Sequence, residues 1–420
     1  MANSVDCPVL TLPTEIAGDI FSDYVGKAHD IRQRDSGPLV LISVCQRWRE
    51  IGLSTCSLWA SVSLLITSKC RWNDAKHFPL FELWLFRAGS HPLDISVSAP
   101  NGTPSRMLSF LSRYSAQWRS FAFFFHPSEA AVLDDLIHGY IPYLAKLDIS
   151  GIPDGSGPVL LNAFREAPSL REVSLSHAAL QSVSLPWIQL THLKINGSLF
   201  RCMKILKETP NLQVLDLEID LQIPSSLPTS LRVTLAHLHT FTFCFGFEGT
   251  VLDHLALPAL RAVELSFLNS DGVARLLTMG ARSAWSPRVI HLASMTSERS
   301  ILCLGSLPSL EEVKLTTSDN LTPLLKLFTD DDHFLPALRS LTIQCERPYP
   351  VVPPTSTFAA MLASRWHRNR EGVAPLTRFH LSFPHGRIMT SAIEELRTTV
   401  RPLMEEGLDV VINFGEFTTL

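Results

Sequence analysis

Two histidines and a run of aspartates are the side chains whose types and spacing could hold a metal ion. His237 and His239 stand two residues apart, so on a strand they would face the same side. A structural zinc site needs four ligands, and no third ligand is spaced to complete one. The run Asp330–Asp332 could attract a cation, but between a predicted helix and Pro336 it is more simply a solvated loop. We therefore expect no metal site.

Motifs for phosphate binding and for nucleophilic catalysis are incomplete. The stretch Asp154–Gly157 is rich in glycine but lacks the lysine and the following Ser or Thr of a phosphate-binding loop. No Gly-x-Ser-x-Gly elbow and no His-Glu-x-x-His helix occurs. A basic group complements the C-terminal end of a helix that begins near Thr357, so no ligand is needed to explain it. This group consists of Arg365, His367, Arg368 and Arg370. We expect a protein without catalytic residues, so not an enzyme, and without a cofactor.

The composition indicates a well-packed globular chain. Of the 420 residues, 46% are hydrophobic and 18% are charged. A formal net charge of −4 argues against nucleic acid or an anionic membrane as a partner. The chain opens with no secretory signal pattern, and no apolar stretch reaches the roughly 18 residues of a membrane helix. The eight cysteines form no Cys-x-x-Cys pair, which is typical of reduced thiols in a protein of the cytoplasm, the nucleus or both.

A repeated pattern, apolar-x-x-apolar-x-apolar, occupies most of the chain. Its ten copies are Trp118/Phe121/Phe123, Leu144/Leu147/Ile149, Leu170/Val173/Leu175, Leu190/Leu193/Ile195, Leu212/Leu215/Leu217, Leu238/Phe241/Phe243, Leu260/Val263/Leu265, Leu310/Val313/Leu315, Leu338/Leu341/Ile343 and Leu376/Phe379/Leu381. A weaker copy stands at Ile290 and Leu292, and Leu408–Phe414 offers a last strand. In six copies a proline stands two residues before the first apolar position, at Pro142, Pro168, Pro210, Pro258, Pro308 and Pro336.

The repeated pattern predicts a strand in each copy, because alternate apolar residues of a strand point to the same side. Most of the segments between the strands predict helices, at Leu160–Glu166, Leu199–Glu208, Asp271–Met279, Pro323–Phe328, Thr357–Trp366 and Ser391–Glu406. One strand and one helix cannot close a core, but stacked copies share one. We predict an α/β fold in which a solenoid of strand–helix units curves with its helices outside. A plain mixture of α/β units is the alternative.

The segment Leu12–Phe21 predicts the first helix of the chain. Pro13 suits the first helical position, and Glu15 lies in the first turn, where the helix dipole favours an anion. Ile16 and Ile20 stand four apart and form an apolar face.

The segment Pro38–Leu64 predicts a second amphipathic helix close to the first. Its apolar residues, Leu41, Val44, Trp48 and Ile51, are spaced three, four and three apart, and Cys45 widens their stripe. Two short helices cannot bury both apolar faces alone, so we expect another surface to cover them.

In this region the sequence resembles the F-box family, and fungal F-box proteins in particular. The pattern is carried, in order, by Leu12-Pro13-x-Glu15-Ile16, Pro38-Leu39, Val44-Cys45-x-x-Trp48-Arg49 and Leu58-Trp59. The resemblance implies a module that docks on the Skp-family adaptor of a cullin-based ubiquitin ligase. It places the adaptor contacts at Leu12, Pro13, Ile16, Ile20, Leu39, Leu41, Val44, Cys45 and Trp48, some of which must instead pack internally. Trp59 would anchor the joint to the repeats. An ordinary small helical core is the alternative.

The repeats resemble leucine-rich repeats, although the Asn or Cys that usually follows the strand is mostly absent. The resemblance implies a distorted horseshoe whose concave face holds a target protein. The side chains between the buried strand positions should line that face: Asp148, Ser174, Lys194, Asp216, Thr242, Glu264, Lys314, Thr342 and His380. Their charges are mixed and include no arginine cluster, so we predict no phosphate-dependent target.

The expected organisation is a short tail (1–10), an F-box domain (11–64), a connecting helix and strand (65–117) and the repeats (118–420). The resemblance implies the substrate-recognition subunit of an SCF-type cullin–RING ubiquitin ligase. Its partners would be the Skp-family adaptor, through it a cullin, and a target whose identity the sequence does not give. A non-catalytic repeat scaffold that does not act in degradation is the alternative.

Overall fold

The computed structural model describes residues 12–26, 29–33, 35–67, 73–99, 105–125, 129–137, 140–151, 160–176, 183–219, 231–244, 249–346, 354–367, 373–383 and 390–414. The chain divides into two compact units, Met1–Ile195 and Asn196–Leu420. Both units combine parallel strands with helices, and the described residues include twelve α-helices. The expected α/β class is therefore confirmed, as a solenoid-like arrangement of strand–helix units.

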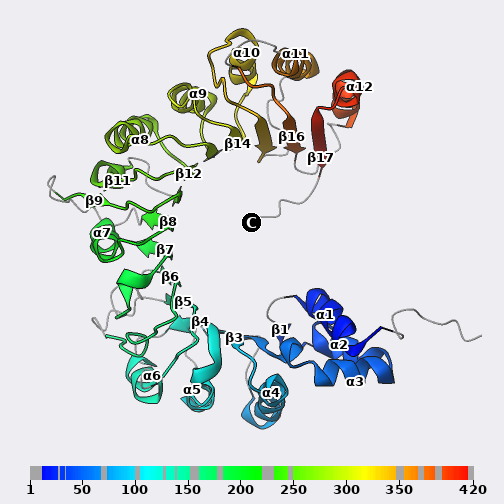
Figure 1. Ribbon diagram of the computed structural model, residues 1–420, viewed down its shortest axis with the longest axis vertical. Helices are drawn as coiled ribbons and strands as arrows, with labels where there is room; N and C mark the ends of the chain where they lie inside the picture. The colour runs from blue at the N-terminus through cyan, green and yellow to red at the C-terminus, as the bar shows by residue number, and fades with distance from the viewer. Residues whose placement is uncertain are drawn as a thin grey trace, which may run out of the picture. The chain divides into compact units, whose positions relative to one another are not determined.

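In the first unit the strands lie side by side in chain order. They are β1 (His29–Asp30), β2 (Ser61–Leu65), β3 (Leu93–Ser98), β4 (Trp118–Phe125), β5 (Lys146–Gly151), β6 (Glu172–Ser176) and β7 (His192–Gly197), whose last two residues extend past the boundary of the unit. The helices are α1 (Thr14–Val25), α2 (Pro38–Val44), α3 (Gln46–Ser54), α4 (Asp74–Ala88), α5 (Ser105–Ser112) and α6 (Ala130–Ile137). Helices α4 to α6 lie on one face of the sheet, and α1 to α3 lie beside β1 (Figure 1). This sheet already includes β1, β2 and β3. The prediction that the repeats begin at residue 118 is therefore wrong, because the sheet begins before that residue.

In the second unit the main sheet follows the order β8-β10-β12-β13-β14-β15-β16-β17. Its strands are β8 (Val214–Ile219), β10 (Thr240–Cys244), β12 (Ala262–Ser266), β13 (Val289–Ala293), β14 (Glu312–Thr317), β15 (Ser340–Cys345), β16 (Arg378–Phe383) and β17 (Asp409–Phe414). A separate pair is formed by β9 (Val233–Thr234) and β11 (Leu255–Ala256). The helices are α7 (Leu199–Glu208), α8 (Ser270–Ser283), α9 (Ser297–Gly305), α10 (Thr322–Asp330), α11 (Thr355–Trp366) and α12 (Thr390–Glu405), and all lie on one face of the sheet (Figure 1).

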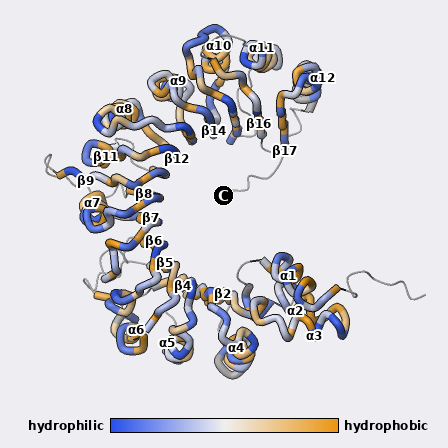
Figure 2. Tube along the Cα trace, viewed as in Figure 1, coloured by the Kyte–Doolittle hydropathy of each residue, from blue (hydrophilic) through white to orange (hydrophobic). Residues whose placement is uncertain are grey.

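Every copy of the repeated pattern contributes a strand, including the weaker copy, which is β13, and the last segment, which is β17. The two in-phase apolar residues are buried against the helices, as Leu147 and Ile149 are on β5, while the residue between them is partly exposed. Figure 2 shows the resulting alternation of hydrophobic and hydrophilic positions along strands such as β8 and β14. The core of each unit is therefore the layer between its sheet and its helices.

The prolines of the repeats open the tight turn that leads into each strand. Pro142 follows Ile141, whose carbonyl accepts a hydrogen bond from the Leu144 N–H at 3.3 Å. The same bond forms around Pro168, Pro258, Pro308 and Pro336. Proline suits the second position of such a turn because its ring fixes φ near −65° and that position donates no hydrogen bond.

A second regular feature is a shared carbonyl at the beginning of successive strands. The Ala145 carbonyl accepts hydrogen bonds from the N–H groups of both Arg171 and Glu172, each at 3.0 Å. In the second unit the Arg288 carbonyl accepts in the same way from Glu311 and Glu312, at 2.8 and 3.0 Å. These paired bonds hold neighbouring strands in register, whatever the length of chain between them.

Most of the predicted helices are confirmed, as α7, α8, α10, α11 and α12. The helix predicted over Leu160–Glu166 is wrong, because this segment forms turns. The Asp134 carboxylate on α6 accepts hydrogen bonds from the backbone N–H groups of Asn162 and Ala163, at 2.7 and 2.6 Å. Leu161 also forms a parallel bridge with Val183, which requires an extended backbone in place of a helix.

The histidine pair does not lie on one strand as expected. His237 is in the turn before β10 and His239 immediately precedes that strand, so the two rings do not share a strand face. The glycine-rich stretch Asp154–Gly157 and the basic residues Arg368 and Arg370 lie outside the described residues.

Candidate docking surfaces

One face of α1 exposes three large apolar side chains. Ile16 is 48% exposed, Ile20 46% and Tyr24 64%, at a spacing of four residues that places them on one side of the helix. The opposite side, with Phe21 and Val25, is buried. An isolated exposed apolar residue is ordinary, but three in line along a helix form a surface suited to a partner.

The segment after α1 forms two helices, where one was predicted. Cys45 is extended, with φ −155° and ψ 171°, and its sulfur accepts a hydrogen bond from the Trp48 N–H at 3.5 Å. The thiol therefore caps α3 and ends α2, so the predicted continuous stripe through Val44 and Trp48 is wrong. Pro13 likewise stands immediately before α1 and is not its first residue.

The structure divides the predicted adaptor contacts into accessible and internal residues. Pro13, Ile16, Ile20 and Val44 are exposed, and Val44 has 56% of its surface open. Leu12, Leu39, Cys45 and Trp48 are partly buried, and the Trp48 ring packs against Phe21 with centroids 4.9 Å apart. Leu41 is only 3% exposed, so its assignment as an adaptor contact is wrong and it packs the helical core. Figure 2 shows the hydrophobic segments within α1, α2 and α3.

Trp59 joins the helical module to the sheet, as expected. Its side chain is fully buried and its Nε1 donates a hydrogen bond to the Gly52 carbonyl of α3 at 2.8 Å. Its ring meets Trp84 of α4 edge to face at 4.9 Å, and the Arg87 guanidinium lies 4.4 Å from the ring centroid. One side chain thus contacts both α3 and the first helix on the sheet.

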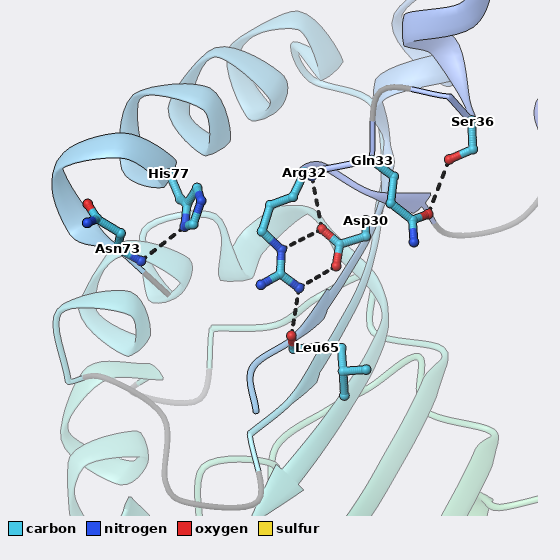
Figure 3. A network of polar contacts seen from close by, with 7 residues as sticks. All are labelled: Asp30, Arg32, Gln33, Ser36, Leu65, Asn73 and His77. Atoms are coloured by element: carbon cyan, nitrogen blue, oxygen red, sulfur yellow. Dashed lines mark hydrogen bonds and ion pairs between the residues drawn. The ribbon is translucent and has the colours of Figure 1, made fainter. Parts of the chain in front are cut away.

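A second connection, not predicted, is an ion pair that holds the loop after α1 against the edge of the sheet (Figure 3). The loop contains β1, which pairs in parallel with β2. The Arg32 guanidinium forms a bidentate pair with Asp30 and donates to the Leu65 carbonyl at 2.6 Å. Nearby on α4, the His77 Nδ1 accepts a hydrogen bond from the Asn73 N–H at 3.0 Å. Burial, with the charges of Arg32 and Lys76, lowers the pKa of His77 and keeps the ring neutral.

The Asp30–Arg32 pair is mostly removed from solvent, with side chains 16% exposed on each partner. Burial alone would raise the pKa of Asp30, but the hydrogen bonds and charge of Arg32 outweigh burial and hold this pKa below its usual value. The carboxylate is therefore ionised at neutral pH and available to fix the loop.

Replacing Arg32 by alanine is expected to release β1 and to lower the free energy of unfolding by about 1–3 kcal/mol, since a bidentate charged pair and a carbonyl bond are lost. Hydrogen exchange of peptides covering residues 29–33 and 61–67 should accelerate. The pKa of Asp30 is lower in the folded protein than its unfolded value of 3.8. The loss of unfolding free energy relative to wild type should therefore be complete above pH 3.8 and should disappear as the pH falls through the folded pKa. Unchanged exchange in these peptides would contradict the connection.

The predicted target-binding side chains form one row on the solvent face of each unit. In the first unit Asp148 pairs in register with Ser174, and Lys194 lies exposed on β7. In the second unit the register aligns Asp216, Thr242, Glu264, His291, Lys314, Thr342 and His380 across successive strands. All residues of the second row are partly buried and polar, so this face offers hydrogen-bonding groups in place of an apolar patch.

His291 is the member of this row that the sequence prediction missed, because it stands in the weaker copy of the repeat. Its Nδ1 lies 2.9 Å from the Glu264 carboxylate, and its Nε2 lies 2.8 Å from the Thr316 hydroxyl. The hydrogen bond from His291 lowers the pKa of Glu264, so this carboxylate is ionised at neutral pH. An acid, an imidazole and a hydroxyl therefore lie in line on the sheet face, and their two mutual contacts hold them as a fixed polar cluster.

Asp148 is held at an energetic cost. Burial raises its pKa, and the hydrogen bond from Ser174 together with the charges of Lys146 and Lys194 only partly offsets that effect. A carboxylate kept in a place that disfavours its charge is a candidate for binding.

Replacing Asp148 by asparagine is expected to stabilise the fold at pH 7 by up to about 1 kcal/mol, a value that allows for screening of a partly exposed group. In the folded protein the ionised form of Asp148 is disfavoured, which is why its pKa is raised. The gain should therefore vanish below the unfolded value of 3.8, where the carboxyl group is neutral in both the folded and the unfolded chain. Thermal midpoints measured at pH 7 and at pH 3 test this, and equal midpoints of the two proteins at pH 7 would refute it.

The remaining chemical groups are structural in the part of the chain that the structure describes. Arg365 lies in the last turn of α11, as predicted for a basic helix end, but its side chain is only 1% exposed and lies inside the second unit. Burial raises the pKa of the Cys202, Cys303 and Cys345 thiols to about 12, so they are protonated at neutral pH. No group of three or more metal-ligating side chains occurs among the described residues. None of the described helices has both the length and the apolar character needed to cross a bilayer.

Comparison with known proteins assigns no family. No family model matches the chain, and no curated protein matches it. Among solved structures, a Bacteroides fragilis protein determined as a structural genomics target superposes with a TM-score of 0.26 at 11% identity. The match covers 72% of this chain and 66% of that protein, just under two thirds of its length. At this identity and TM-score the likeness carries no argument about the family or the function of this chain.

Proposed function

We propose that this chain is the substrate-recognition subunit of an SCF-type cullin–RING ubiquitin ligase. Helices α1 to α3 act as an F-box that binds the Skp-family adaptor, and the leucine-rich-repeat-like horseshoe holds the target protein. The chain transfers no ubiquitin itself and raises the local concentration of the target near the ligase.

The observation that carries this proposal is the apolar surface left open on the helical module. Ile16, Ile20 and Val44 are each about half exposed, and they belong to the segments that resemble the F-box pattern. Covering them requires a second protein with an apolar groove, which is the role that the adaptor would fill.

The attachment of the module to the sheet supports the same proposal. A recognition subunit must hold its target at a fixed place relative to its adaptor. Trp59 and the Asp30–Arg32 pair both tie the module to the beginning of the sheet. Two independent connections limit the freedom of the joint, as this role requires.

The test is complex formation between the purified chain and a purified Skp-family adaptor, measured by size-exclusion chromatography with light scattering. A one-to-one complex is expected. An adaptor that elutes separately from the chain would remove the proposal. A complex that promotes no ubiquitin transfer to bound proteins, once cullin, RING protein and conjugating enzyme are added, would favour the non-catalytic scaffold.

A further inference from the structure

A hollow of about 400 Å³ opens on the solvent face of the sheet in the first unit. Its walls are the charged side chains Asp94, Arg119, Lys146, Arg171 and Glu172. Its floor is made of small side chains, including Ser96, Ser120, Ala122 and Ala145. We call it the β3–β6 hollow. It adjoins the predicted target-binding row, because Ala122 pairs in register with Asp148.

The hollow exists because alanine stands between two arginines. Arg119, Ala145 and Arg171 occupy equivalent positions just before or at the beginning of neighbouring strands. The Ala145 N–H donates to the Arg119 carbonyl at 2.8 Å, and the Ala145 carbonyl accepts from the Arg171 N–H at 3.0 Å. Neighbouring strands are about 4.8 Å apart, so the two arginine backbones are separated by roughly 10 Å with only a methyl group between them.

The charges around the hollow leave one cation in excess. Arg119 pairs with Asp94, and Lys146 lies 3.4 Å from Glu172. Arg171 donates to the carbonyls of Pro168 and Leu170, at 3.0 and 2.8 Å, and forms no ion pair with a carboxylate of the described residues. The two ion pairs are between 31% and 57% exposed, and such pairs contribute at most about 1 kcal/mol, so they can rearrange at little cost.

We propose that the β3–β6 hollow binds one acidic side chain, Asp or Glu, presented by an extended segment of the target protein. The carboxylate lies over Ala145, where Arg171 can donate two parallel hydrogen bonds and Arg119 or Lys146 can add a third. The serine hydroxyls of the floor hydrogen-bond the backbone of the segment. This inference rests on the proposed function only in calling the ligand a target.

Asp148 limits the hollow to a single acid. It lies two residues beyond Lys146 on β5, and a second carboxylate seated there would face a like charge. The acidic side chain must therefore lie at the amino-terminal ends of the strands, and its neighbours in the segment should be neutral or basic.

The test is selection of short random peptides by surface display against the purified full chain. Wild type should enrich peptides with a single Asp or Glu at one aligned position. Changing that residue to Gln or Asn in a selected peptide should weaken binding by at least about tenfold. No enrichment of acidic residues, or binding that survives this change, would overturn the inference.

Two variants assign the binding to the hollow. Ala145→Leu fills it while every charge is kept, and Arg171→Glu reverses the excess charge; each should weaken the selected peptide by at least about tenfold. The matched control is Arg339→Glu, because Arg339 is also exposed and immediately precedes a strand, β15. Asp148→Asn should bind at least as tightly as wild type. Equal binding by wild type, Ala145→Leu and Arg171→Glu would place the peptide elsewhere and contradict the inference.

Peptide binding to the hollow can fail or succeed independently of adaptor binding. No adaptor takes part in the selection, and Ala145 lies on the sheet face and not on α1 to α3. Adaptor binding by the Ala145→Leu variant, with an unchanged thermal midpoint, shows that the chain is folded. Loss of peptide binding in that folded variant then reports on the hollow alone.

Discussion

A chain carrying both Ile16→Asp and Val44→Asp is expected to bind the Skp-family adaptor at least about a hundredfold more weakly than wild type. Each side chain is about half exposed, so covering it by a partner contributes about 1–2 kcal/mol. Aspartates in their place would be covered without a compensating partner, which adds a desolvation cost. A combined loss near 3 kcal/mol corresponds to a hundredfold change in the dissociation constant. Isothermal titration calorimetry measures it.

The control for this prediction is Leu302→Asp on α9. Leu302 is 51% exposed, between the values for Ile16 and Val44, so it tests the effect of placing aspartate at an exposed apolar site. Both proteins should keep their stability within about 0.5 kcal/mol, because all three positions are on the surface. Adaptor affinity equal to wild type in the doubly substituted chain would show that α1 and α2 do not form the docking surface.

Replacing Arg365 by alanine is expected to destabilise the second unit by about 3–5 kcal/mol. Its buried guanidinium donates to the carbonyls of Phe328 at 2.7 Å and Phe334 at 2.6 Å. Longer bonds reach Leu335 at 3.3 Å and Asp331 at 3.4 Å. One side chain of α11 thus holds the end of α10 and the loop that follows it. Alanine would remove the guanidinium donor from these buried carbonyls, of which that of Leu335 also accepts from the Leu338 N–H, and would remove the ring contact with Phe328.

Thermal unfolding tests this second prediction, with a fall in the midpoint of roughly 10 °C for a unit of this size. Arg365→Lys should recover little, because an ammonium cannot reach carbonyls arranged around a planar fork. Arg261→Ala is the matched control: Arg261 is exposed and should change the stability by less than about 0.5 kcal/mol. A midpoint of Arg365→Ala equal to that of wild type would refute the structural role.

The strands were the part of the fold most accessible to sequence reasoning. Alternate burial on a strand forces a period of two, and ten copies of the same pattern reinforce one another, so even the weaker copy at Ile290 and Leu292 could be placed. The segment Leu160–Glu166 was misassigned because distant partners hold its backbone: Leu161 bridges to Val183, and the Asp134 carboxylate bonds the Asn162 N–H. No local pattern encodes these contacts.

The helical module and the sites show the same limit. The break at Cys45 depends on a thiol that caps α3, whereas the apolar spacing on either side predicts a single helix. Arg365 has the residue type and the position of a solvated helix end, and only the packing of α10 against α11 reveals that it is buried. The β3–β6 hollow depends on an alanine aligned between two arginines by backbone pairing, and that alignment is a tertiary property.

The shared carbonyls at the beginnings of the strands have a consequence for how this protein can change. These bonds fix the spacing and the register of neighbouring strands. A segment on the helical side can therefore gain or lose residues without moving the predicted target-binding side chains on the sheet. The side chains that bind a ligand can therefore change independently of the helical segments. Single substitutions on the strands can alter which ligand is bound, while insertions and deletions accumulate harmlessly on the outside.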